Sequence, residues 1–91
     1  MGPYPGGNRS VLNITAATVV KATSGVLVTV SVFVAGSAAG AAYDLATNTP
    51  AAANEIGVIP NAVGLYEFQW PCSTGILIVP GTGQSVSVSY S

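Results

Sequence analysis

Hydrophobic residues alternate with other residues along much of the chain. The clearest case is the segment 26–34, where every second residue is valine: Val26, Val28, Val30, Val32 and Val34. Side chains alternate between the two faces of a β-strand, whereas the apolar stripe of a helix repeats about every 3.6 residues. The pattern predicts a strand with one packed valine face and with the residues between the valines on its opposite face, namely Leu27, Thr29, Ser31 and Phe33.

Two later segments show the same alternation. Near the C-terminus, Val86, Val88 and Tyr90 are expected to point inward, and the serines between and beside them to point outward. In the segment 65–70, Tyr66, Phe68 and Trp70 share one face, opposite Leu65, Glu67 and Gln69. Two interpretations of this aromatic face stay open: the rings fill the core of a small domain, or they form a platform that stacks against sugar rings.

Clusters of Gly, Pro, Ser, Thr and Asn divide the chain into short segments. Turns are predicted at 23–25, 36–40, 47–50, 60–64, 71–75 and 80–84, and the last of these (PGTGQ) is interpreted as a hairpin turn. The segment 51–56 has helical propensity and predicts a single helical turn in a loop. We therefore predict an all-β fold, a compact antiparallel β-sandwich of about seven to eight short strands, of the jelly-roll or immunoglobulin-like kind.

The first ten residues differ from the rest of the chain. Two prolines and three glycines fall within residues 2–7, a composition that favours extended or turning backbone. We predict an extended arm over residues 1–10 and the sandwich domain over residues 11–91. The arm is either a disordered tail or a segment that lies on a neighbouring subunit, and in the second case its candidate interface residues are Pro3, Tyr4, Pro5 and Arg9.

Charged side chains are rare in this sequence. Five of the 91 residues are charged and none is histidine, whereas about 25% of a typical soluble domain is charged. With a formal net charge of −1, copies can approach one another without strong repulsion, so self-association is expected. Two basic residues cannot supply the phosphate contacts that a nucleic acid needs, and we expect no such partner.

The uncharged stretch between Lys21 and Asp44 is long enough to cross a bilayer as a helix. It alternates with Thr and Ser, however, and then reaches the small-residue run 36–40 (GSAAG), which is typical of a turn. A strand followed by a turn is therefore favoured over a membrane helix, and no membrane partner is expected.

The sequence contains few side chains that could act as a nucleophile, an acid or a base. Cys72 is the single cysteine and is interpreted as a small buried apolar residue, because the histidine or nearby base that activates a nucleophilic thiol is missing. Asp44, Glu55 and Glu67 are the only carboxylates, and each is interpreted as a solvated side chain or an interface ion pair rather than as half of an acid–base pair. We predict no catalytic, cofactor or metal site, and no enzyme.

Four segments made of strand and turn signatures carry a resemblance to a known group of proteins: 13–23 (NITAATVVKAT), 35–44 (AGSAAGAAYD), 59–72 (IPNAVGLYEFQWPC) and 79–84 (VPGTGQ). Through them, residues 11–91 resemble small structural proteins of tailed bacteriophages. The resemblance implies a virion protein on the capsid surface, of the decoration or cement type, which is a compact β domain, commonly a trimer, bound to the major capsid protein.

The expected function follows from this resemblance together with the neutral surface. A decoration protein binds the assembled capsid and stabilises the shell by bridging its subunits, and the Pro/Gly arm is expected to reach across a capsomer boundary. The alternative is a head-fibre, tail or receptor-binding module that recognises a host-surface glycan through Tyr66 and Trp70.

Overall fold

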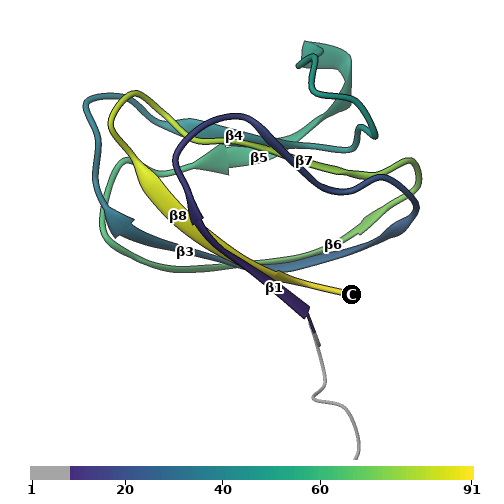
Figure 1. Ribbon diagram of the computed structural model, residues 1–91, viewed down its shortest axis with the longest axis horizontal. Coiled ribbons are helices and arrows are strands. Elements are labelled where there is room, and N and C mark those ends of the chain that lie inside the picture. Colours follow the sequence, from purple (N-terminus) through teal and green to yellow (C-terminus); the bar gives the residue numbers. More distant parts are fainter. Residues whose placement is uncertain (1–8) are drawn as a thin grey trace, which may run out of the picture.

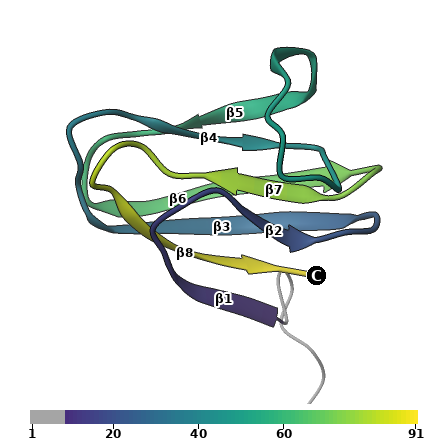
Figure 2. The ribbon, with the colours of Figure 1, turned by 45° about the horizontal axis from the view of Figure 1, so that its top comes forward.

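The computed structural model describes residues 9–91 and shows an all-β sandwich in that part of the chain (Figure 1). Its elements are β1 (Arg9–Ile14), β2 (Thr18–Lys21), β3 (Gly25–Val34), β4 (Gly40–Tyr43), the 3₁₀ helix η1 (Ala52–Asn54), β5 (Glu55–Ile59), β6 (Gly64–Cys72), β7 (Ile76–Val79) and β8 (Ser85–Tyr90). The strands form two antiparallel sheets of four strands each, as Figure 2 shows from a second side. The predicted fold class is confirmed.

The order of the strands identifies the kind of sandwich. Sheet A has the order β1-β8-β3-β6, and sheet B has the order β2-β7-β4-β5. The pairs β1·β8, β2·β7, β3·β6 and β4·β5 are all antiparallel neighbours, so the chain runs as one long hairpin wound into two sheets. This is the arrangement of a jelly roll, the first of the two kinds that the sequence predicts.

One predicted hairpin is wrong. The turn at 80–84 joins β7 to β8, and these strands belong to different sheets, so the turn carries the chain from sheet B to sheet A. Its local geometry is nevertheless that of a tight turn, because the Gln84 N–H donates to the Gly81 carbonyl at 3.0 Å and Gly83 has φ 74°. A tight turn uses the same residue types whether the next strand pairs in the same sheet or crosses to the other sheet. The turn residues alone therefore do not distinguish a hairpin from a crossover.

The core lies between the two sheets and is built from aliphatic side chains of both. It comprises Ile14, Leu27, Val30, Val32, Ala42, Ile59, Cys72, Ile76, Ile78, Val86 and Val88. Val86 and Val88 are buried as predicted, and the ring of Tyr90 packs against the same cluster.

The valine face of β3 is confirmed in part. Val28, Val30 and Val32 are buried, but so is Leu27, which the alternation places on the opposite face. The reason is an irregularity between Leu27 and Thr29, where the register of β3 shifts relative to both β6 and β8. A bulge of this kind adds a residue and moves the inward series by one position. At the end of the strand, Val34 is 44% exposed.

A buried glutamine ties together the loops at one end of the sandwich, where the β3–β4, β5–β6 and β7–β8 connections meet (Figure 2). The Gln84 side chain is 1% exposed; its Nε2 donates to the Pro60 carbonyl at 2.9 Å and its Oε1 accepts from the Gly81 N–H at 3.0 Å. Gly81 packs so closely on the β3–β4 loop that a Cβ there would overlap the Ala38 carbonyl oxygen.

The uncharged stretch between Lys21 and Asp44 forms β3, a bend and β4, as the favoured interpretation predicts. Across residues 9–91, we find no helix with the length and apolar character needed to span a membrane. The single predicted helical turn is confirmed as η1, which follows the β4 strand and leads directly into β5.

Candidate interaction surfaces

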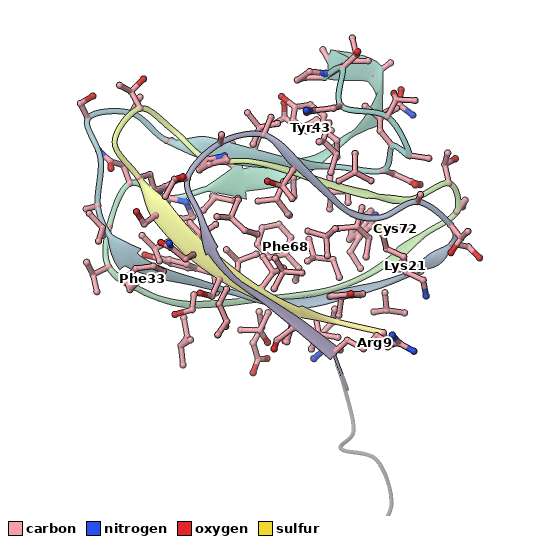
Figure 3. All side chains as sticks on the ribbon, viewed as in Figure 1. Arg9, Lys21, Phe33, Tyr43, Phe68 and Cys72 are labelled. Carbon is pink, nitrogen blue, oxygen red and sulfur yellow. The ribbon has the colours of Figure 1, made fainter. Side chains whose placement is uncertain are left out.

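The predicted interface residues of the arm are only partly placed. Pro3, Tyr4 and Pro5 lie outside the described residues. Arg9 is exposed and opens β1, where it pairs with Tyr90 of β8; Figure 3 shows it at the edge of the sheet. Strand β1 therefore begins inside the segment predicted as an arm, and Arg9 and Ser10 belong to sheet A.

Asp44 follows β4 and fastens the loop between β6 and β7. Its carboxylate accepts hydrogen bonds from the backbone N–H groups of Ser73 (3.0 Å), Thr74 (2.8 Å) and Gly75 (3.2 Å). Burial raises the pKa of this carboxyl, but the three amide hydrogen bonds outweigh that effect and hold the pKa below its ordinary value. The sequence interpretation, a solvated side chain or an ion pair, missed this role of Asp44 as a structural acceptor.

The two other carboxylates lie apart, in different sheets. Glu55 opens β5 in sheet B, and Glu67 lies on β6 in sheet A; both are exposed. Among residues 9–91 there is no group of three or more His, Cys, Asp and Glu side chains that could hold a metal ion, and no pocket is found there.

Cys72 ends β6 and is a free, buried thiol in the core, as the sequence predicts. Burial raises its pKa, and the negative charge of Asp44 raises it further, so the reactive thiolate is disfavoured. Figure 3 shows Cys72 and the ring of Phe68 between the two sheets.

The three aromatic side chains of β6 differ in burial. Tyr66 and Phe68 pack against the core, and the Tyr66 hydroxyl donates to the Ala62 carbonyl at 2.8 Å. Trp70 is 49% exposed. The core interpretation is therefore confirmed for Tyr66 and Phe68 and wrong for Trp70, because Trp70 lies near the end of an edge strand, where sheet A has no further strand to cover it.

The outer face of sheet B is apolar. Ile78 and Ala42 form an inward-facing pair, and on either side of this pair a cross-strand row points away from the core. One row consists of Val19, Leu77, Tyr43 and Glu55, and the other of Val79, Ala41 and Val58. Leu77 is fully buried within the chain, and Val19, Tyr43, Val79 and Ala41 are partly exposed. Glu55 is the one charged residue in these rows, and Val58 is 58% exposed. Figure 3 shows Tyr43 on the outer side of this sheet. We call these seven residues the sheet B face.

The outer face of sheet A is rich in hydroxyl groups instead. One row crosses all four strands and consists of Ser10, Ser89, Thr29 and Glu67; the next consists of Ser87, Ser31 and Leu65. The predicted outward positions of the β8 serines therefore line up with hydroxyl residues of β1 and β3. The two outer faces of the sandwich differ in character, one apolar and the other polar but almost uncharged.

A smaller apolar cluster lies at one corner of sheet A. It consists of Phe33, Val34, Val63 and Leu65, which are 45%, 44%, 67% and 74% exposed. Ser31 pairs with Leu65 and Val32 with Gly64, so Phe33 and Val34 at the end of β3 lie next to Val63, which directly precedes β6. We call these four residues the β3–β6 patch; Phe33 marks it in Figure 3.

No protein-family model, curated protein or solved structure matches this chain. A fold alone does not specify a function, because one fold supports many.

Proposed function

We propose that this chain is a phage virion structural protein that binds the assembled capsid as a decoration or cement protein. The observation that carries the proposal is the sheet B face, two rows of outward residues with Glu55 as their single charge. The exposed part of this face, above all Val58, favours a contact that covers it, with the partly exposed Val19, Tyr43 and Val79 around it. The proposed cover is the outer surface of the capsid, with the major capsid protein as partner.

The contrast between the two outer faces supports this orientation. With the sheet B face on the shell, the hydroxyl-rich face of sheet A points to solvent, where Ser10, Ser89 and Thr29 can remain hydrated. A protein that binds only the assembled shell stabilises it by mass action, because occupancy favours the assembled state over the loosened one.

The resemblance of residues 11–91 to small structural proteins of tailed phages supports the same function. The jelly roll adds an analogy at the level of the fold, since viral capsid domains are one of the groups that use it. Self-association of neighbouring copies, as a trimer or another closed ring, belongs to the proposal because the net charge is only −1.

The first test is the copy number of the chain in purified particles, measured by quantitative mass spectrometry against the major capsid protein. A copy number comparable with that of the major capsid protein is expected, because decoration covers the whole shell. A few copies per particle would instead place the chain at a vertex, fibre or tail, and its absence from particles would overturn the proposal.

A second candidate function, recognition of a host-surface glycan by a fibre or tail module, is favoured by one observation. Trp70 is 49% exposed on an edge strand, and an exposed indole is a common stacking surface for sugar rings. Since Tyr66 packs against the core, Trp70 would act without it. A glycan array probed with wild-type protein and with Trp70→Ala tests this function: binding that is lost in the variant supports it.

A further inference from the structure

The β3–β6 patch coincides with an open strand edge. Strand β6 pairs with β3 on one side and is the last strand of sheet A on the other. The backbone groups along that outer edge are a template for pairing with another strand. Leu65, the most exposed member of the patch, lies on this strand.

The two halves of β6 differ in how well they are protected against such pairing. The second half carries a charge at Glu67, a positive φ of 49° at Gln69 and a proline at Pro71, which all discourage the docking of another strand. The first half, from Gly64 to Tyr66, has none of these features. The unprotected half is the half that carries the patch.

We propose that the β3–β6 patch and the adjoining edge of β6 form the surface through which one copy of this chain binds a second copy. The inference deepens the proposed function by naming the contact between neighbouring copies, and for its biological role it rests on that function. The contact itself is a property of the free protein and can be measured without particles.

Charge and symmetry favour a second copy as the occupant. The patch contains no charged residue, and Ser31 and Ser87, the next residues along the Leu65 row, are neutral as well. Two identical patches can therefore meet without like-charge repulsion. A charged patch would repel a second copy of itself. A second copy also brings the same open edge, so one contact covers two apolar patches and two unpaired strand edges.

The opposite edge of sheet A provides a matched control. Leu12 lies on β1, the other edge strand, and is 71% exposed, almost as much as Leu65. Leu12 is the one large hydrophobic residue of β1 that is exposed, so this edge carries no apolar patch. Strand β1 is also interrupted by a register shift and by a φ of 56° at Asn13. A lysine at position 12 therefore tests the general effect of a new surface charge on an edge strand.

The experiment measures the mass of the full chain in solution by analytical ultracentrifugation over a range of concentrations, for wild type, Leu65→Lys and Leu12→Lys. Circular dichroism confirms that each variant is folded. We expect the wild type to self-associate, Leu65→Lys to weaken association by about tenfold or more, and Leu12→Lys to associate as the wild type does.

A wild-type dimer that dissociates in Leu65→Lys supports the proposal, because a contact between two identical patches closes at two chains. A monomeric wild type at the highest concentration reached, or equal association in wild type and Leu65→Lys, overturns it. Because no capsid is present, this failure would leave the proposed binding to the shell untouched, and failed binding to shells would leave the self-contact untouched. If Leu65→Lys does not fold, Val63→Lys replaces it, since Val63 lies outside the strands and is 67% exposed.

Discussion

The Oδ1 atom of Asp44 accepts a hydrogen bond of 2.8 Å from the backbone N–H of Thr74, a residue 30 positions further along the chain. Together with the bonds from Ser73 and Gly75, it closes the β6–β7 loop against the end of β4. An ionised carboxylate is well suited to this role because it has two acceptor oxygens and charge-assisted hydrogen bonds are strong.

The first prediction concerns Asp44 and pH. The folded state holds the pKa of this carboxyl below its ordinary value, so its contribution to stability is present above the unfolded pKa and is lost as pH falls through the folded one. We expect the free energy of unfolding of the wild type, measured in urea, to fall as pH drops below about 4.

The variant Asp44→Asn has one acceptor oxygen and places an amide N–H₂ where the second carboxylate oxygen stood. We expect it to lose about 1–3 kcal/mol at neutral pH, since hydrogen bonds to a charged group contribute that much. Its stability should change less than that of the wild type over the acid range. Glu67→Gln, on the exposed face of β6, serves as the control; an equal acid response in wild type and Asp44→Asn would contradict the prediction.

The second prediction concerns the close packing of loops at the opposite end. Gly81→Ala introduces a Cβ that overlaps the backbone carbonyl oxygen of Ala38, which cannot move without shifting the β3–β4 loop. We expect a loss of about 3 kcal/mol, the upper end of the usual cost of overpacking. Gly57→Ala is the control, because the nearest atom to its new Cβ is Cε2 of Phe68 at 3.4 Å.

Urea unfolding of both variants measures this difference. Gly57→Ala should stay within about 0.5 kcal/mol of the wild type. If both variants are equally stable, the loop contact around Gly81 is looser than the structure shows.

The third prediction separates the two large side chains of β6. Phe68 packs against the core and Trp70 is half exposed. We expect Phe68→Ala to cost about 3 kcal/mol and Trp70→Ala about 1 kcal/mol, because the second removes less buried area. Thermal unfolding compares them, and a larger loss for Trp70→Ala would restore the interpretation of its indole as a core side chain.

Alternation along the chain was sufficient to predict β3, β6 and β8, because the two faces of a strand are a local property of its sequence. It could not predict that the inward series of β3 passes from Leu27 to Val30, since the bulge depends on the register of β6 and β8. The exposure of Trp70 likewise depends on the absence of a further strand beyond β6.

The role of Asp44 was missed for a related reason. Its partners at 73–75 are brought to it by the pairing of β4 with β7, and nothing in the residues around position 44 indicates which backbone amides will face the carboxylate. The turn at 80–84 shows the same limit, because its residues specify a sharp turn but not the sheet that the next strand joins.

The last prediction concerns the sheet B face and the shell. In Val58→Lys, a charge is added to a residue that is 58% exposed in the free protein, so the lysine stays hydrated there and folding should be affected little. On the proposed shell contact, the same lysine loses its water in an apolar interface. We expect its affinity for shells depleted of the chain to fall about tenfold or more relative to the wild type.

The matched control is Ser89→Lys, which adds the same charge to the opposite face of the sandwich, in the row that joins Ser10 and Thr29. It should bind shells as the wild type does, because this face points to solvent in the proposed orientation. Co-sedimentation with depleted particles measures both affinities. Equal loss in the two variants would indicate a general effect of charge, and loss in Ser89→Lys alone would reverse the orientation.

Salt dependence adds an independent criterion for the same contact. A contact formed by apolar rows with a single carboxylate gains little from long-range attraction, so wild-type binding should persist when the salt concentration is raised to about 1 M. Strong weakening of wild-type binding in that range would mean that a charged group outside these rows, such as Arg9, dominates the contact, and the sheet B face would then not be the surface that holds the chain on the shell.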